Sequence, residues 1–291
     1  MDTREVEAAA ANSPPPLSPG EFARFARVIT ERLGIRMPDI KVTMLQGRLA
    51  RRIRQLHLSS FEEYRKYLFS SPHSEREYVH FINAITTNKT DFFREPSHFE
   101  YLVERALPTL AAGISFTGSR RARIWCAGCS SGEEAWTLAM TLSEYAKKTP
   151  GFDFSILATD VSTRVLAHAQ EATYPRQSVE PVPPALRQSY LLSSRDPSRK
   201  LVRMVPDLRR RVTFRRLNFM ENQYGLSETY DVVFFRNVMI YFDKPVQEAV
   251  LNKLCRHLRH GGFLFVGHSE SLAGLRVPLR QETLAVYRKT G

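Results

Sequence analysis

The chain has 291 residues, of which 43% are hydrophobic and 25% charged, an ordinary balance for one large domain plus a smaller one. No apolar run approaches the roughly 20 residues that span a bilayer, and the N-terminus lacks the regions of a signal peptide, so we expect a cytoplasmic protein. The formal net charge of +12 suits a nucleic acid, an anionic membrane surface or an acidic protein partner, without choosing among them.

The N-terminal part is expected to be helical after a short arm. Residues 1–17 are rich in Ala, Pro and Ser, a composition that cannot bury a core and predicts a disordered arm. Ser18, Pro19 and Glu21 then form the signature of a helix start with a capping box. Apolar spacing over 18–92 predicts a small all-α domain, with later helices near 40–57, 60–69 and 74–85.

A linker over 93–121, with a helix near 96–110, is expected to lead into a second domain over 122–291. In this domain apolar strands alternate with helical patterns, which predicts a parallel sheet with crossover helices. The expected strands are 122–127, 154–159, 212–217, 230–235, 262–267 and one near 283–288, and the expected helices are 132–147, 162–171 and 244–258. The last two strands are too close for a crossover helix, so one of them should be antiparallel.

The proline-rich region 173–211 interrupts this alternation. Its patterns predict a short helix near 183–191 and a strand at 201–205. We expect an inserted subdomain with a small antiparallel sheet.

The segment that follows the first expected strand is the most informative. Residues 126–134 form a Gly/Ser-rich loop that opens a helix, which is how doubly wound domains hold a nucleotide-like ligand. Glu133 and Glu134 begin that helix, and two carboxylates would repel a phosphate. They therefore favour a cationic or zwitterionic ligand such as S-adenosylmethionine over a dinucleotide or ATP.

Three further polar positions follow strand ends. Asp160 lies where a carboxylate would grip a ribose diol, although it could instead cap the next helix. Asn218 follows the third strand, and Arg236 and Tyr241 follow the fourth, where Tyr241 could also be a core residue. Cys126 and Cys129 have the spacing of a metal or redox motif, but no second pair accompanies them, so we expect reduced thiols and no metal.

Four blocks in this order resemble the CheR family of chemoreceptor glutamate O-methyltransferases. The blocks are residues 86–95, 131–134, 236–242 and 267–271, and the resemblance extends from about residue 20 to the end. It implies an α/β protein with an all-α N-terminal domain and a doubly wound, Rossmann-like S-adenosylmethionine domain that carries an inserted antiparallel β-subdomain. The implied reaction gives glutamate methyl esters on chemoreceptors and S-adenosylhomocysteine as the second product.

The resemblance also implies a role for individual residues. Cofactor contacts would come from Asn88, Thr90, Arg94, Glu133, Asp160, Asn218, Phe219, Phe235 and Arg236. Glu133 would hold the methionine end, Asp160 the ribose, and Asn218 with Phe219 the adenine. Phe235 replaces a smaller residue, so its contact would be through the backbone. Arg94 and Tyr241 would lie nearest the reacting methyl group and act as the catalytic residues.

The basic charge suggests where a receptor could dock. Arg48, Arg51 and Arg52 share one face of an expected helix and could bind the acidic methylation helix of a receptor, although a solvated basic face is as good an explanation. We expect recruitment to membrane receptor arrays without membrane insertion. Residues 193–200 lack the glycines with which some family members grip a receptor C-terminal tether, so tether-independent action is favoured.

Two other functions compete with this interpretation. A nucleic-acid methyltransferase would explain the basic charge, but the chain lacks an Asn/Asp-Pro-Pro-aromatic motif and a catalytic Pro-Cys. A non-catalytic scaffold that senses the cofactor would share the fold, but it would not need Arg94 and Tyr241.

Overall fold

The computed structural model describes residues 14–70, 74–113 and 121–290, and the chain divides into two compact units, Met1–Thr87 and Asn88–Gly291. This division lies before the boundary near residue 92 that the helical pattern suggests, so the segment 88–92 groups with the second unit. Within the described residues, no helix is long and apolar enough to cross a membrane.

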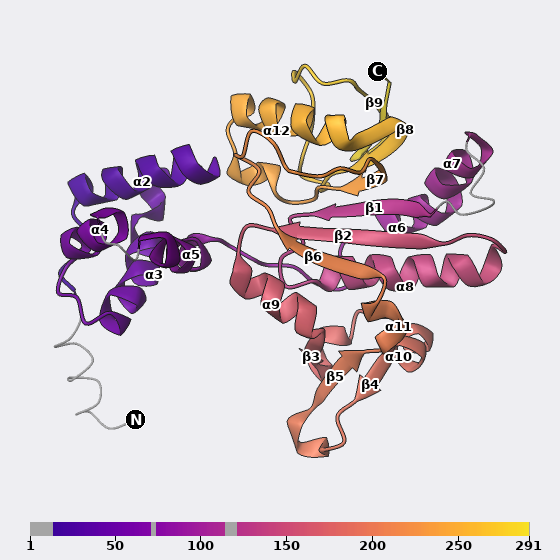
Figure 1. The fold of residues 1–291 in the computed structure, drawn as a ribbon, viewed down its shortest axis with the longest axis horizontal. Helices are drawn as coiled ribbons and strands as arrows, with labels where there is room; N and C mark the ends of the chain where they lie inside the picture. Colours follow the sequence, from indigo (N-terminus) through magenta and orange to yellow (C-terminus); the bar gives the residue numbers. More distant parts are fainter. Residues whose placement is uncertain (1–13, 71–73, 114–120, 291) are drawn as a thin grey trace. The chain divides into compact units, whose positions relative to one another are not determined.

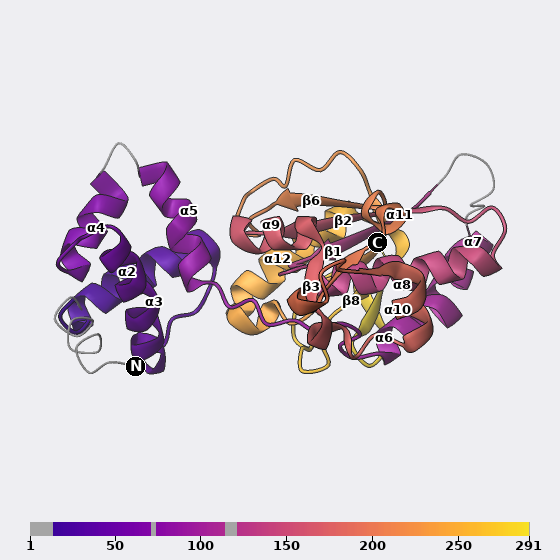
Figure 2. The ribbon, with the colours of Figure 1, turned by 90° about the horizontal axis from the view of Figure 1, so that it is seen from below.

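The first unit is a cluster of helices around an aromatic core (Figure 2). Its elements are α2 (Pro19–Leu33), η1 (Asp39–Lys41), α3 (Val42–Gln55), α4 (Phe61–Ser70) and α5 (Ser74–Ile85). The Phe25 ring lies 6.2 Å from that of Tyr64 and 6.0 Å from that of Phe81, and all three residues are fully buried. These rings come from α2, α4 and α5, so the core closes only when the helices pack together.

The start of α2 confirms part of the predicted cap and corrects the extent of the arm. The hydroxyl of Ser18 accepts a hydrogen bond from the backbone N–H of Glu21, as an N-cap should. The Glu21 carboxylate pairs with Arg24 and Arg65. Residues 1–13 lie outside the described part, but Leu17 is buried and its N–H donates to Gln46, so the predicted disordered arm is too long at this end.

The second unit is built on a seven-stranded, mostly parallel sheet with the order β6-β2-β1-β7-β8-β10-β9 (Figure 1). The strands are β1 (Ala122–Ala127), β2 (Phe154–Asp160), β6 (Val212–Arg216), β7 (Tyr230–Phe234), β8 (Leu258–Phe265), β9 (Leu279–Thr283) and β10 (Val286–Lys289). Strands β6, β2, β1, β7 and β8 are parallel, and β10 pairs antiparallel with β8. The predicted antiparallel strand near the end is thus confirmed.

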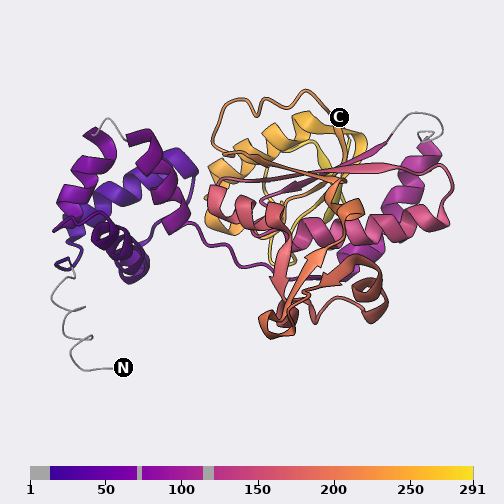
Figure 3. The same ribbon diagram turned by 60° about the horizontal axis from the view of Figure 1, so that its bottom comes forward.

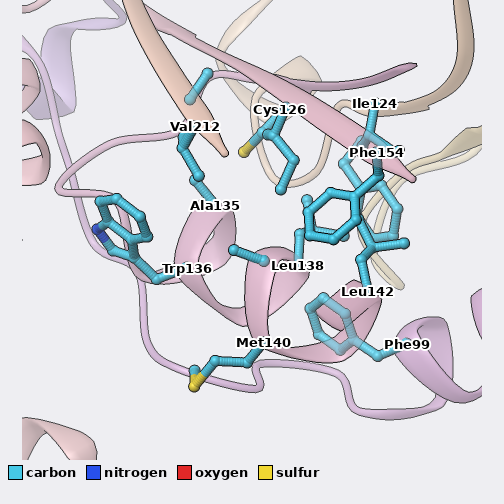
Figure 4. Packing of buried hydrophobic residues seen from close by; sticks show 14 of the residues in the cluster. Phe99, Ile124, Cys126, Ala135, Trp136, Leu138, Met140, Leu142, Phe154 and Val212 are labelled. Atoms are coloured by element: carbon cyan, nitrogen blue, oxygen red, sulfur yellow. The ribbon is translucent and has the colours of Figure 1, made fainter. Parts of the chain in front are cut away.

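Helices cover both faces of this sheet. The helices α8 (Glu133–Lys148) and α9 (Thr163–Glu171) lie on one face and α12 (Lys244–His257) on the other (Figure 1). Leu138 and Leu142 of α8 are fully buried against the strands, beside Phe154 (Figure 4). A doubly wound sheet of this kind binds ligands at the carboxyl ends of its strands, near the point where the strand order reverses. Here that point lies between β1 and β7.

The predicted insertion is present on the α8 side of the main sheet (Figures 1 and 3). Its antiparallel strands β3 (Thr173–Pro175), β5 (Leu201–Met204) and β4 (Leu191–Ser193) form a separate sheet. The short elements η3 (Arg176–Val179), α10 (Pro184–Tyr190), η4 (Pro197–Arg199) and α11 (Pro206–Arg209) accompany them.

Two details of the second unit differ from the sequence prediction. The expected linker helix is α6 (Ser97–Tyr101) and α7 (Leu107–Gly113), joined by a π-helical turn, η2 (Leu102–Ala106). The second residue of α7 is Pro108, which has no backbone N–H to donate. The single strand expected near 283–288 is a hairpin, β9 and β10, that turns at Ala285 with a positive φ of 59°. Strand β9 is mostly exposed, so its sequence lacks the apolar alternation that predicts a strand.

Candidate active site

The loop after β1 is shaped by close backbone contacts. The N–H groups of Gly128 and Cys129 both donate to the carbonyl of Thr159, at 2.7 and 2.8 Å, which joins the ends of β1 and β2. Gly128 has a φ of +84°, and a Cβ there would lie 2.5 Å from the Val238 side chain. The loop therefore requires glycine at this position, both for its conformation and for its approach to the segment after β7.

Asp160 links this loop to the end of β2. Its carboxylate accepts the N–H of Ser130 and the N–H of Ser162, each at 2.9 Å. The N-cap of α9 is Ser162, so the alternative that Asp160 caps this helix is wrong. Burial raises the pKa of Asp160 in spite of these bonds. Each carboxylate oxygen keeps a lone pair with which it could accept a ligand hydroxyl.

Two further carboxylates begin α8. Glu133 accepts the hydroxyl of Ser131 at 2.7 Å, and burial raises its pKa. The next residue, Glu134, lies 3.1 Å from the guanidinium of Arg236 and accepts a hydrogen bond from the thiol of Cys126. Burial raises the pKa of Glu134 as well. Carboxylates that lose hydration in this way are suited to a ligand that brings a positive charge.

The segment 88–95 is fixed against the β1 loop and the start of α8. The hydroxyl of Ser130 donates to the carbonyl of Asn88 at 2.9 Å, and the N–H of Phe93 donates to the hydroxyl of Thr137. Thr90 lies between these two attachments and is half-buried. The segment that contains Asn88 and Thr90 is thus attached to the loop after β1 and to α8, which begins at Glu133.

Arg236 is the central charge of this region. Its side chain is 1% exposed and pairs with Glu95 at 3.0 Å and with Glu134 at 3.1 Å. It also donates to the carbonyl of Arg94. The residue predicted as a cofactor contact therefore connects the end of β7 to the Arg94 segment and to α8, and its contact with a cofactor stays a prediction.

The two predicted catalytic residues come from different segments at these strand ends. Arg94 is half-buried between Phe93 and Glu95, which have positive φ values of 54° and 55°. Tyr241 is also half-buried and ends the short turn η5 (Met239–Tyr241). Positive φ at such residues is uncommon and persists only where contacts fix it, as Arg236 does here.

The predicted adenine region is largely aromatic. Asn218 follows β6, and its side-chain oxygen accepts the N–H of Met220 at 3.0 Å. The rings of Phe219 and Phe235 meet edge to face with centroids 5.0 Å apart, and Phe235 is fully buried. The side chain of Phe235 is part of the core, so a contact with a ligand would be made by its backbone, and this contact stays a prediction.

Sequence analysis missed Glu270, which follows β8. Its buried carboxylate accepts the N–H groups of Gly267 and Asn237, each at 2.7 Å, and that of Ile240 at 3.2 Å. Burial raises its pKa while these bonds oppose the rise. Glu270 therefore holds the segment that leads to Tyr241. No local pattern identifies this role, because a single glutamate in a loop has no characteristic spacing.

The arginines predicted to dock a receptor differ in the structure of the first unit, because two of them bind other residues of that unit and one is exposed. Arg48 donates to the carbonyls at the end of α5, and Arg52 forms a two-point ion pair with Glu77, at 2.9 and 2.7 Å. Arg51 is exposed and makes no ion pair or hydrogen bond with the described residues. Its neighbour Arg54 is also exposed. The available positive charge is thus on Arg51 and Arg54, whereas Arg48 and Arg52 stabilise the helical unit.

Comparison with known proteins agrees with this organisation. Residues 20–86 match the model of the CheR methyltransferase all-alpha domain, and residues 88–287 match that of the CheR methyltransferase SAM binding domain. A chemotaxis protein methyltransferase of Klebsiella aerogenes is 38% identical, with 89% of this chain and 85% of that protein covered. One of Escherichia coli K12 is 37% identical, with 94% and 92% covered.

Similarity to solved structures is weaker. The plantazolicin methyltransferase BpumL in complex with SAH has a TM-score of 0.31 and 13% identity, with 69% of this chain and 55% of that chain covered. The two family models together span both units. The chain belongs to the CheR methyltransferase family, and its second unit is an S-adenosylmethionine-binding methyltransferase domain.

Proposed function

We propose that this protein methylates glutamate side-chain carboxylates of chemoreceptors, with S-adenosylmethionine as the methyl donor. The observation that carries the proposal is the junction at Arg236, which holds the Arg94 segment against the end of the strand that leads to Tyr241. Arg236 thus joins the segment of Arg94 to the segment that leads to Tyr241, and both of these side chains are suited to a carboxylate substrate. The names of the relatives, chemotaxis protein methyltransferases, support the same function.

The chain offers suitable groups for the cofactor. When bound, S-adenosylmethionine supplies an electrophilic methyl group on a positively charged sulfonium. Glu133 would hold its amino acid end, and Asp160 would accept hydroxyls of its ribose. Asn218 and Phe219 would contact the adenine, and the backbone at Phe235 would line the same cleft. The raised pKa values of Glu133 and Asp160 support this assignment, because a cationic amino group beside Glu133 and hydroxyl donors beside Asp160 would stabilise the charged forms.

A glutamate nucleophile would not need a general base. Its carboxyl pKa in water is about 4.3, so it is already ionised at neutral pH. Burial raises the pKa values of Cys126 and Cys129, which keeps both as thiols and disfavours a covalent route through sulfur. Alignment of the reactants and exclusion of water would supply most of the acceleration. Arg94 would orient the substrate carboxylate, and Tyr241 would position the reacting groups.

The test is transfer of labelled methyl from S-adenosylmethionine to receptor-containing membranes, followed by treatment with base. Base-labile label on the receptor would support a carboxyl methyl ester. Arg94→Ala and Tyr241→Phe should each lower kcat/KM by more than about 3-fold, while the exposed Arg105→Ala serves as a matched arginine control. Normal kcat/KM in both variants would contradict the assignment, and base-stable label would indicate another acceptor.

We further propose that Arg51 and Arg54 guide the acidic methylation helix of a receptor, and that the enzyme works in the cytoplasm at receptor arrays.

The β-subdomain loop between β4 and β5 is closed by its own hydrogen bonds, with Asp196 accepting both the N–H and the hydroxyl of Ser198. These bonds, together with the absence of glycine from residues 193–200, favour tether-independent action. Methylation of a receptor shortened by its C-terminal peptide should therefore proceed at an unchanged rate, and a large loss would contradict this part of the proposal.

A further inference from the structure

His98 is a buried histidine whose environment is unusual. His98 is 2% exposed, and neither of its ring nitrogens has a hydrogen-bond partner within the described part of the chain. The ring packs edge to face on Phe265 and on His268, with centroids 5.7 and 4.6 Å away. A buried polar group without a partner lowers the stability of the fold, so such a group calls for an explanation such as a bound ion.

The surroundings of His98 supply two more possible metal ligands. Glu95, His98 and His268 each offer one ligand atom, and all these atoms lie within 4.8 Å of one another. The Glu95 carboxylate is 3.5 Å from Nδ1 of His98. Ligands about 2.0–2.1 Å from a tetrahedral zinc ion are about 3.3 Å apart. The distance of 3.5 Å between Glu95 and His98 is thus close to the spacing of two zinc ligands. The exposed ring of His268 would have to move closer to the other two residues.

This group is held by contacts outside its own side chains. The backbone N–H of His268 donates to the Glu95 carboxylate at 3.2 Å, and the hydroxyl of Ser97 lies 3.4 Å from Nε2 of His268. The loop after β8 is therefore attached to the start of α6. The three residues are close together because of the fold, since 173 positions of sequence separate Glu95 from His268.

We propose that Glu95, His98 and His268 bind one divalent transition-metal ion of the zinc class. Two imidazoles and a carboxylate suit Zn²⁺ or Co²⁺ better than Mg²⁺ or Ca²⁺, which prefer oxygen ligands alone. Three protein ligands leave a fourth position for water.

The metal would compete with Arg236. The same carboxylate oxygen of Glu95 lies 3.0 Å from the guanidinium of Arg236, which also donates to the carbonyl of Arg94. An ion that recruits this oxygen would weaken the Glu95–Arg236 pair and loosen the segment around Arg94. The site would therefore be inhibitory, a consequence that rests on the proposed catalytic role of Arg94.

Metal binding can be measured without any receptor. Full-length protein freed of metal with a chelator is titrated with Co²⁺, and its visible absorption reports the coordination. We expect one ion per chain, with binding at least about 10-fold weaker in His268→Ala. That substitution is on an exposed side chain, and the exposed His260→Ala is the matched control that should bind normally.

Three outcomes would overturn the site: no binding by the unmodified protein, equal binding by His268→Ala, or an intense thiolate–cobalt band that indicates Cys126 and Cys129 as the ligands. The coupling is tested separately with Zn²⁺ in the methyl-transfer assay. Inhibition that a chelator reverses and that His268→Ala resists is expected. Binding without inhibition would retain the site and overturn its coupling to Arg94, whereas failure of methyl transfer in the absence of metal would count against the proposed function alone.

Discussion

Arg236 in the second unit and Arg51 in the first show two different uses of the same side chain. Arg236 is almost fully buried and connects two carboxylates and a backbone carbonyl. Arg51 is exposed, with no ion pair in the described part of the chain. A buried charge needs its partners and so fixes the positions of the segments that provide them. An exposed charge leaves the fold unaffected and is available to a partner.

The largest effect should follow from Arg236→Ala. The substitution leaves Glu95 and Glu134 as largely buried charges without their cation, and breaking such a pair costs about 3–5 kcal/mol. Denaturant unfolding followed by circular dichroism measures the change in the free energy of unfolding. Arg51→Ala is the matched comparison and should stay within about 0.5 kcal/mol. Similar values for both variants would remove the distinction between these two arginines.

Substitution of Glu270 should reduce catalysis through the position of Tyr241. In Glu270→Gln one oxygen is replaced by an NH₂ group, which cannot accept the backbone N–H groups that the carboxylate holds. We expect kcat to fall about 10-fold, which corresponds to about 1.4 kcal/mol, with the Kd for S-adenosylmethionine within about 3-fold. Single-turnover kinetics and calorimetry separate the two quantities, and Glu282→Gln on the exposed strand β9 is the control.

Charge reversal on α3 should distinguish a structural arginine from an available one. Arg52→Glu places a carboxylate against the buried Glu77, which should lower the free energy of unfolding by about 1–3 kcal/mol. Thermal and denaturant unfolding measure this change. Arg51→Glu has no such neighbour and should unfold normally.

Charge reversal at the two exposed arginines, Arg51 and Arg54, tests receptor docking. Arg51→Glu should weaken receptor methylation several-fold, more so at low salt, while cofactor affinity is unchanged. Initial rates at several ionic strengths provide the measurement. Normal methylation by both Arg51→Glu and Arg54→Glu would exclude this face as the docking surface.

The smallest expected effect is a pH dependence that arises from the raised pKa values of Glu133 and Asp160. Because the folded-state pKa lies above the unfolded one, these groups contribute stability at pH values below the unfolded pKa and lose it as pH rises through the folded pKa. Binding of a cationic cofactor should lower both pKa values and release protons. Affinity should thus fall as the solution becomes acidic, which calorimetry in buffers of different ionisation enthalpy can measure.

Glu133→Gln keeps an acceptor for Ser131 and removes one charge. It should bind the cofactor more weakly at neutral pH and show a shallower pH dependence. An unchanged pH dependence would mean that Glu133 does not sense the cofactor charge.

The sequence by itself determined most of the element order and the strand ends at which the ligand site is proposed. Strands and helices follow from hydrophobic periodicity, and the loop around Gly128 follows from residue types that act locally. The residues that come after β1, β2, β6 and β7 are therefore identifiable from the order of residues along the chain. The place of Asp160 at a strand end already predicts its ribose role, whereas the other individual roles are implied by resemblance to the CheR family.

The tertiary structure decided which charges meet. Arg236 and Glu95 are 141 positions apart, and Asn237 and Glu270 are 33 apart, so no local spacing predicts either contact. The same applies to Arg52 and Glu77, whose pairing removes one arginine from the expected docking face. Periodicity indicates which face of an element is buried, whereas the partners of a buried charge depend on how distant elements pack.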